Sequence, residues 1–241
     1  MSTGSSAAEK EHATRVRSMF ANISARYDLL NHLLSGNMDK RWRHKVSQHL
    51  ETLIGEGGAV LDVACGTGDL SLELSESLRA RVVGTDFCRP MLEVAQLKAS
   101  KDKRMVPFIE GDALHLPFAE NAFDGATIAF GLRNLASFEG GLKELLRIVR
   151  PGGAVVVLEF STPTWSGFRA LFNFYFQRVL PLLGGAVSGS RSAYKYLPES
   201  VTRFPDQQKL AELMRSVGFE KVGYSNLTGG IAAIHFGAKP S

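Results

Sequence analysis

Apolar and polar positions along this chain follow two patterns. Short continuous apolar runs predict buried strands, and stretches with an apolar residue at every third or fourth position predict amphipathic helices. We expect strands at 59–64, 81–84, 106–110, 123–130, 154–160, 221–227 and 230–238. We expect helices at 69–79, 90–100, 138–149 and 207–217.

The N-terminal part has a different pattern. Residues 1–12 are mostly small or polar and predict a frayed tail. Residues 13–54 predict helix with a break at Gly36. One apolar face of this helical stretch is formed by Leu29, Leu30, Leu33 and Leu34.

Strands that alternate with helices of this length predict a parallel sheet built from strand–helix–strand units. The last two strands are separated only by Thr228 and Gly229, which indicates a hairpin and an antiparallel strand pair. We therefore expect an α/β fold with a seven-stranded mixed sheet and helices on both faces. Residues 1–54 form its N-terminal tail and helical cap, and residues 55–241 form the main domain. A helical insertion at about 161–203 follows the fifth strand, so the chain is effectively one domain.

Composition narrows the class of protein. A chain of 241 residues that is 44% hydrophobic and 22% charged supports one core and is neither disordered nor a disulfide-stapled miniprotein. The longest stretch without a charged side chain, 222–238, contains polar residues and glycines, so it is not a spanning helix. The net charge of +4 is too small to predict a nucleic-acid partner. Residues 1–10 lack an apolar segment, so we expect no secretory signal and a cytoplasmic location.

The first candidate site is the segment 61–69, in which a strand runs into a glycine turn and then a helix. Ligands of open α/β sheets bind at the carboxyl ends of the strands, and we assign Asp62, Gly66 and Gly68 to cofactor binding. Ser71 occupies the third glycine position of a dinucleotide motif, and Asp69 lies where a pyrophosphate would bind. The motif therefore favours the cationic S-adenosylmethionine over NAD, the alternative being a tight turn with incidental glycines.

Acidic residues follow the next two strands. Asp86 lies about 20 residues beyond the first glycine, where a carboxylate accepts hydrogen bonds from ribose hydroxyls. Asp112 and Ala113 follow the third strand, where an acid or its neighbouring amide contacts adenine nitrogens. The structural alternatives are a helix cap for Asp86 and a surface turn for the second pair.

The segment Phe130 to Asn134 follows the fourth strand. It brings Arg133 and Asn134 to the mouth of the sheet, where a substrate would meet the cofactor methyl group. An ordinary strand exit with a surface arginine is the alternative. The six histidines and the two cysteines lack metal-ligand spacing, so we expect no metal.

Further motifs point to one family. They are Phe20, Tyr27 to Asn31, Leu34-Ser35, Trp42, Phe130 to Asn134, Arg147 to Gly153, Leu158 to Ser161, Tyr194 and Tyr196 to Ser200. Over about residues 15–239 the chain resembles the ubiquinone/menaquinone biosynthesis C-methyltransferases, which are class I S-adenosylmethionine-dependent enzymes with a Rossmann-like fold. It departs from that pattern at Asp39, where histidine is usual, and at Cys65, Cys88 and Arg150.

The resemblance implies S-adenosylmethionine as cofactor, with contacts from Thr67, Asp86, Asp112 and Ala113. It implies C-methylation of a 2-polyprenyl hydroquinone, with 2-demethylmenaquinol as the expected substrate in the last step of menaquinone synthesis. The benzoquinol precursor of ubiquinone is the alternative, alone or in addition. A more remote alternative is a non-catalytic cofactor-binding scaffold of a quinone-synthesis complex. A nucleic-acid methyltransferase is disfavoured, because no target-base motif follows the fourth strand.

The chemistry suggests roles for four residues. Ring carbon becomes nucleophilic when the adjacent hydroxyl ionises, and a free phenol has a pKa near 10. The Arg133 guanidinium remains protonated, so we expect it to stabilise the phenolate while Asn134 orients it. Tyr27 and Asp28 are expected to close over the ring.

The segment 161–187 is rich in aromatic and aliphatic residues but is interrupted by Arg169 and Arg178. Three interpretations stay open for it. It covers the quinol site, it docks peripherally on the inner face of the cytoplasmic membrane, or it packs as a plain helical insertion against the sheet.

Overall fold

The computed structural model describes residues 7–24, 27–28, 31, 35–165, 167 and 191–241. Its centre is a seven-stranded sheet with the strand order β3-β2-β1-β4-β5-β7-β6. Only β7 runs antiparallel to its neighbours β5 and β6. The strands are β1 (Ala59–Val63), β2 (Arg81–Asp86), β3 (Phe108–Glu110), β4 (Phe123–Ala129), β5 (Val149–Phe160), β6 (Glu220–Leu227) and β7 (Ala232–Ala238). The predicted mixed sheet with one hairpin is confirmed.

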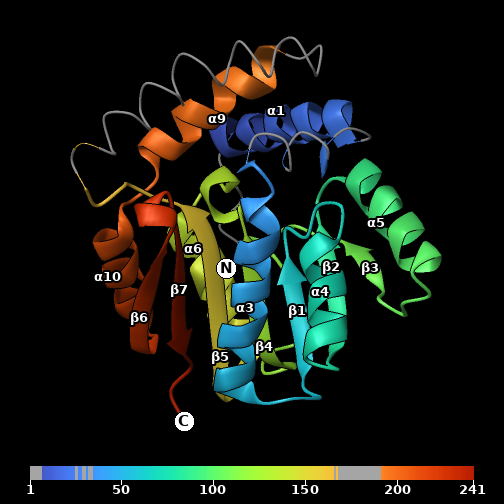
Figure 1. The fold of residues 1–241 in the computed structure, drawn as a ribbon, viewed down its shortest axis with the longest axis vertical. Helices are drawn as coiled ribbons and strands as arrows, with labels where there is room; N and C mark the ends of the chain where they lie inside the picture. Colours follow the sequence, from blue (N-terminus) through green and yellow to red (C-terminus); the bar gives the residue numbers. More distant parts are fainter. Residues whose placement is uncertain (1–6, 25–26, 29–30, 32–34, 166, 168–190) are drawn as a thin grey trace.

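Helices cover both faces of the sheet (Figure 1). They are α1 (Ala7–Ile23), α3 (Met38–Ile54), α4 (Asp69–Ser77), α5 (Arg89–Lys101), α6 (Phe138–Ile148), α9 (Arg191–Arg203) and α10 (Gln207–Val217). Two 3-10 turns, η2 (Leu132–Asn134) and η4 (Thr228–Gly230), follow β4 and β6.

Two apolar layers hold the helices to the sheet. Along β5, Val156 packs with the layer under α3 and α4, while Val155 and Val157 pack with the layer under α6 and α10. Successive side chains of a strand point to opposite faces, so a strand buried on both sides is apolar throughout. This explains why β5 appears in the sequence as an unbroken apolar run.

Local side chains fix where helices begin. The Ser137 hydroxyl accepts a hydrogen bond from Gly140 N at 2.9 Å, and the Asp206 carboxylate accepts one from Lys209 N at 3.0 Å. Both satisfy backbone donors that the first helical turn leaves free. They place α6 and α10 at the predicted positions.

Two boundaries differ most from the sequence-based expectation. The helix α1 begins at Ala7, so the frayed tail predicted over 1–12 is wrong for residues 7–12. Alanine and glutamate in this stretch favour helix, and α1 continues to a buried Val16. Strand β5 begins at Val149, before Pro151-Gly152-Gly153, because Val149 pairs with Phe123 ahead of a register shift. The predicted stop therefore ends α6 but not the following strand.

The break predicted at Gly36 is confirmed, since Gly36 and Asn37 adopt left-handed backbone angles before α3 begins. The predicted leucine face of Leu29, Leu30, Leu33 and Leu34 lies outside the described residues, as does most of the insertion at 161–187. No helix within the described ranges is long and apolar enough to cross a membrane.

The helices α1 and α9 cross the edge of the sheet at which the parallel strands end (Figure 1). Ile23 at the end of α1 packs with Met91 of α5 and with Cys88. The N-terminal helix thus lies over the carboxyl end of β2, at the edge where α/β sheets bind ligands.

Candidate active site

A glycine turn joins β1 to α4. Gly66 and Gly68 have φ values of +55° and +81°, which favour glycine. A Cβ atom at Gly68 would lie 2.9 Å from both Ala95 Cβ and Phe108 Cζ. The turn therefore packs tightly against α5 and β3, and only glycine fits its second position.

Asp86 lies at the carboxyl end of β2 and is 7% exposed. Its carboxylate accepts hydrogen bonds from Gly66 N at 2.9 Å and Cys88 N at 2.8 Å. Burial raises the pKa of Asp86 to about 6, although the backbone donors at Cys88 and Gly66 oppose that rise. A carboxylate has about four acceptor positions, so beside the backbone donors at Cys88, Gly66 and Phe87 capacity remains for a ligand hydroxyl.

Asp62 lies at the end of β1 and is also buried. It accepts hydrogen bonds from Ser71 Oγ at 2.6 Å and Thr127 Oγ1 at 2.9 Å, and burial raises its pKa to about 6. These bonds join β1 to α4 and β4 immediately beside the glycine turn. Both side-chain oxygens of Asp62 thus face protein hydroxyls.

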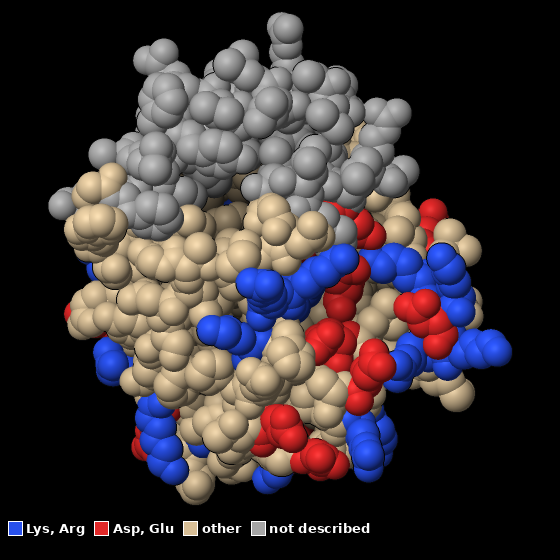
Figure 2. All heavy atoms as spheres, in the orientation of Figure 1, with Lys and Arg blue, Asp and Glu red and all other residues tan. Residues whose placement is uncertain are grey.

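The N-terminal segment is fastened to the glycine turn. Thr67 Oγ1 donates to Asp28 Oδ1 at 2.5 Å, and Lys98 Nζ lies 2.8 Å from Asp28 Oδ2. Lys98 also forms an ion pair with Asp69. Arg43 of α3 lies 3.0 Å from Asp69. Acidic and basic side chains intermingle over the face formed by α3, α4 and α5 (Figure 2).

This ion-pair cluster changes the charge expected at the start of α4. Asp69 was expected to disfavour a phosphate at the helix start, yet Lys98 and Arg43 compensate its charge. The sequence analysis missed both cations. The spacing of Asp39 and Arg43, four apart on a helix, was a signal for the second one. Asp39 is buried against Arg43 at 2.5 Å, so this departure from the family pattern belongs to an ion pair.

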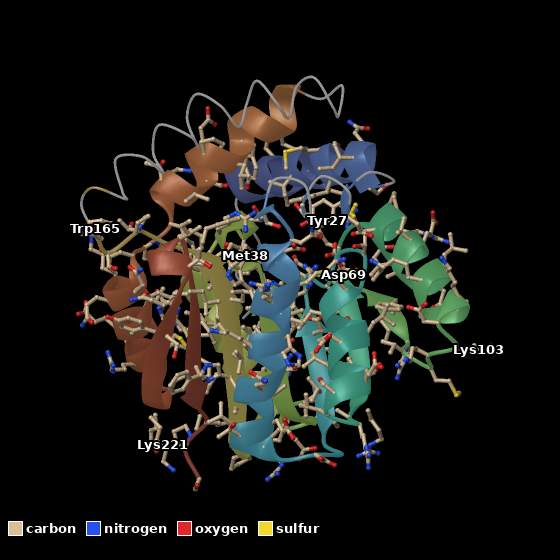
Figure 3. All side chains as sticks on the ribbon, in the orientation of Figure 1. Tyr27, Met38, Asp69, Lys103, Trp165 and Lys221 are labelled. Carbon is tan, nitrogen blue, oxygen red and sulfur yellow. The ribbon has the colours of Figure 1, made fainter. Side chains whose placement is uncertain are left out.

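Tyr27 covers the glycine turn (Figure 3). Its ring packs edge-on against Phe20, with 5.9 Å between ring centroids. A Cβ atom at Gly66 would lie 3.9 Å from Tyr27 Cε1. Burial raises the pKa of the Tyr27 hydroxyl, opposed by a hydrogen bond with Asn31 and by the charge of Arg133.

The pair Asp112-Ala113 follows β3, as expected. Asp112 Oδ1 accepts a hydrogen bond from Leu114 N at 2.9 Å and is solvent-exposed, whereas Ala113 is buried. Arg17 of α1 reaches across this end of the sheet, with its Cζ atom 5.5 Å from the Phe87 ring centroid. A side of the candidate site is thus formed by α1, which belongs to the predicted N-terminal helical cap.

Arg133 and Asn134 lie in η2, beyond β4. Arg133 Nη1 donates to Glu159 Oε1 at 2.7 Å and to Phe130 O at 2.5 Å. Asn134 Nδ2 donates to Phe130 O at 3.2 Å, and Asn134 Oδ1 accepts from the Tyr196 hydroxyl of α9 at 3.1 Å. Arg133 is 7% exposed, so the alternative of a surface arginine is wrong.

The structure brings Tyr27 of the N-terminal segment and Tyr196 of α9 each close to Arg133 of η2. Burial raises the pKa of both Tyr27 and Tyr196, and the positive charge of Arg133 opposes this rise at each hydroxyl. Sequence reasoning missed Tyr196 and Glu159 as site residues. An acid within the apolar run of β5 was a signal for Glu159, because an acidic side chain is seldom buried without a partner.

An apolar wall adjoins the arginine. Phe130, Phe160 and Trp42 form one aromatic cluster, with 4.8 Å between the centroids of the two phenylalanine rings. Arg133 Cζ lies 5.3 Å from the Phe160 centroid. Among the residues that the structure describes, no group of three or more potential ligands could hold a metal ion.

Comparison with known proteins gives a consistent result. The ubiE/COQ5 methyltransferase family matches residues 8–239. A demethylmenaquinone methyltransferase of Thermus thermophilus is 51% identical over 224 residues, covering 92% of this chain and 100% of that protein. A ubiquinone/menaquinone biosynthesis C-methyltransferase UbiE of Geotalea uraniireducens is 42% identical over 237 residues, covering 95% of this chain and 98% of that protein.

Solved structures share the fold. A SAM-dependent methyltransferase of Thermotoga maritima superposes with a TM-score of 0.62 at 19% identity, covering 93% of this chain and 99% of that one. A phosphoethanolamine N-methyltransferase of Haemonchus contortus, in complex with S-adenosyl-L-methionine, gives 0.58 at 14% identity, covering 81% of this chain and 52% of that one. At such identities the similarity shows the Rossmann-like fold alone.

Proposed function

The chain belongs to the ubiE/COQ5 methyltransferase family, and from this we infer that it methylates a ring carbon of a polyprenyl hydroquinone. The methyl donor is S-adenosylmethionine, and the acceptor is 2-demethylmenaquinol. The observation that carries this proposal is 51% identity along the full length of a demethylmenaquinone methyltransferase. The name of the Geotalea relative covers the ubiquinone pathway as well, so the benzoquinol is the second acceptor to test.

The residues at the sheet edge fit the cofactor. Asp86 offers an acceptor position to a ribose hydroxyl, and the glycine turn allows close approach of a ligand to the backbone at Gly66. We assign Thr67, Asp112 and Ala113 to the same site. Asp62 contributes indirectly, because its bonds to the Ser71 and Thr127 hydroxyls hold the turn in place.

The bound cofactor supplies an electrophilic methyl group on a sulfonium. The protein must therefore activate the carbon that attacks it. Loss of the proton from the neighbouring hydroxyl places electron density on that carbon, and Arg133 stabilises the resulting phenolate by its fixed positive charge. Transfer of the methyl group would form the new carbon–carbon bond as the sulfur–methyl bond breaks and S-adenosylhomocysteine leaves, and the methylated ring carbon would then lose its proton to water, which restores aromaticity. Only the reduced quinol supports this sequence.

The surroundings of Arg133 suit an aromatic substrate. Phe130 and Phe160 supply apolar contact for a ring, while Asn134 and Tyr196 form a hydrogen-bonded pair that orients its hydroxyl. Tyr27 and Asp28 close the site from the N-terminal side. Asn134 is thereby an orienting residue, and Tyr27 and Asp28 cover the reacting groups.

The polyprenyl tail requires contact with a lipid phase. Trp165, at the start of the apolar segment 161–187, is 73% exposed. We assign to this segment a peripheral contact with the inner face of the cytoplasmic membrane, because an exposed indole is typical of the membrane interface. The chain then takes its substrate from the bilayer surface.

The test is methyl transfer from labelled S-adenosylmethionine to chemically reduced 2-demethylmenaquinol, with the demethylated benzoquinol precursor of ubiquinone in parallel. Label in the naphthoquinol alone establishes a menaquinone enzyme, and label in both establishes a dual enzyme. The matching oxidised quinones serve as controls and should remain unlabelled. Cofactor binding without label in either quinol would overturn the proposal in favour of a scaffold.

A further inference from the structure

Glu159 is a buried carboxylate close to the proposed reacting groups. It lies near the end of β5 and is 1% exposed. Burial raises the pKa of its carboxyl group, and the charge of Arg133 opposes this rise. Burying a carboxylate is costly unless it is paired and hydrogen-bonded, so its contacts show what retains it there.

Both oxygens of Glu159 are committed to neighbouring donors. Oε1 accepts from Arg133 Nη1 at 2.7 Å and from Phe160 N at 2.9 Å. Oε2 accepts from Arg133 N at 3.2 Å. Glu159 therefore holds Arg133 by both its backbone and its guanidinium, and it is itself fixed by the backbone of its own strand.

These contacts commit Nη1, so donation from the guanidinium to a ligand falls to Nε or Nη2. Nη1 also donates to Phe130 O at 2.5 Å, so both of its hydrogens are used. Within the described part of the chain, Arg133 Nε is buried and has no hydrogen-bond partner. A buried donor without an acceptor is unfavourable, and a ligand oxygen would satisfy it.

We propose that Glu159 is a positioning residue for methyl transfer, which holds Nη1 so that the Nε group of Arg133 donates to the substrate oxygen that becomes the phenolate. This role rests on the proposed quinol methylation. Glu159 itself touches neither substrate nor cofactor. Its contribution acts through Arg133 alone.

The experiment compares Glu159→Gln, Glu159→Asp, Arg133→Ala and the double variant Arg133→Ala/Glu159→Gln with the wild type. We expect Glu159→Gln to lower kcat at least tenfold while KM and the Kd of S-adenosylmethionine change less than about threefold. Glu159→Asp keeps the charge but withdraws the carboxylate by one methylene, so it should lose kcat similarly. In the Arg133→Ala background, Glu159→Gln should cause no further loss of kcat, because residues that act as one unit are non-additive.

A matched control is Asp124→Asn. Asp124 also pairs with an arginine, Arg150 at 2.5 Å, and accepts from a backbone N–H, that of Ala59 at 2.7 Å, at the opposite edge of the sheet. The Asp124→Asn substitution should leave kcat unchanged. A kcat within threefold of wild type for Glu159→Gln, or the same fractional loss with and without Arg133, would overturn the positioning role.

A second readout does not need turnover. Reduced quinol with S-adenosylhomocysteine should shift the nitrogen-15 NMR signal of Arg133 Nε–H in the wild type but not in Glu159→Gln, provided that both are folded. A shift of equal size in both proteins overturns the role of Glu159 and leaves the proposed function intact. A wild type that neither methylates a quinol nor shows this shift overturns the proposed function, and the positioning role with it.

Discussion

Asp28 and Thr67 lie 39 residues apart in the sequence and are joined by a hydrogen bond of 2.5 Å. This bond fastens the N-terminal segment to the turn that is proposed to bind the cofactor. Lys98 strengthens the connection, because its ammonium group contacts both Asp28 and Asp69. The N-terminal segment is therefore held against the glycine turn by a hydrogen bond and by a cluster of charges.

The first prediction concerns this connection. Asp28→Asn and Lys98→Gln should each weaken S-adenosylmethionine binding about tenfold, which is roughly 1.4 kcal/mol. The reason is that Tyr27 and the segment around it would be held less firmly over the turn. Isothermal titration calorimetry measures the change. Glu93→Gln, which removes an exposed partner of Arg89 on the same helix as Lys98, is the control and should have no effect. An unchanged Kd in both test variants would show that closure does not contribute to binding.

The second prediction concerns pH. The pKa of Asp86 is about 6 in the folded protein. As the pH falls through 6, Asp86 takes up a proton and becomes a poorer acceptor for ribose hydroxyls. The Kd of S-adenosylmethionine should therefore rise by roughly tenfold between about pH 7 and about pH 5. Calorimetry across this range tests it.

Two variants separate the groups that titrate together, since the pKa of Asp62 is also about 6. Asp86→Asn should bind weakly at every pH, whereas Asp62→Asn should keep the pH dependence. If Asp62→Asn instead abolished the pH dependence and Asp86→Asn kept it, Asp62 would be the group that controls binding.

The stability of the protein without cofactor should change with pH in the opposite direction to cofactor binding. A raised folded-state pKa means that the native protein binds more protons than the unfolded chain. Without cofactor, these two groups lower stability as the pH rises from about 4 to about 6.

The third prediction concerns the cation beside the substrate. Arg133→Ala should reduce kcat at least tenfold, roughly 1.4 kcal/mol in activation free energy, because the phenolate loses its stabilising charge. Arg133→Lys should not restore the rate, since the compact ammonium group of lysine lacks the planar fork with which the guanidinium donates from Nη1 to Glu159 and Phe130 and presents Nε at a separate position. Steady-state kinetics with reduced 2-demethylmenaquinol measure both variants.

Stability must be followed at the same time. Arg133→Ala leaves the carboxylate of Glu159 buried without its cation, a change that destabilises proteins by about 3–5 kcal/mol in other cases. The double variant Arg133→Ala/Glu159→Gln removes that charge and should regain melting temperature without regaining kcat. Recovery of kcat in the double variant would show that the loss came from misfolding rather than from the missing guanidinium.

The fold follows from the sequence because it depends on short-range patterns. The central strand β5 appears as an apolar run, and the hairpin appears as Thr228-Gly229 between the last two strands. The start of α1 differs from the expectation because the helix propensity of residues 7–12 outweighs the usual fraying of a chain terminus. The early start of β5 depends on pairing of Val149 with Phe123, a contact between distant residues.

For the candidate site, too, short-range patterns could be predicted and long-range contacts could not. The places of Asp86 and Asp112 at the sheet edge could be predicted because Asp86 ends β2, Asp112 lies two residues beyond β3, and parallel strands end at one edge. Lys98 and Tyr196 could not, since they reach the site from helices whose approach is fixed only by tertiary packing. The sequence shows Glu159 as an unusual acid in a buried strand. Its partner Arg133 could not be predicted, because Arg133 follows a different strand, β4.

The last prediction concerns membrane contact. The chain contains two tryptophans, of which Trp42 is 5% exposed and Trp165 is 73% exposed. If the segment that begins near Trp165 docks on a bilayer, its indole moves from water to the lipid interface, whereas the environment of Trp42 does not change. Fluorescence emission should therefore shift to shorter wavelength on addition of vesicles of anionic and zwitterionic phospholipid.

Trp165→Phe removes the reporter, so the shift should disappear while flotation with the vesicles persists in part. Higher salt should reduce flotation if Arg169 and Arg178 contact anionic head groups. An unchanged spectrum together with no flotation, with or without anionic lipid, would show that the segment does not bind membranes and that the quinol must reach the site by another route.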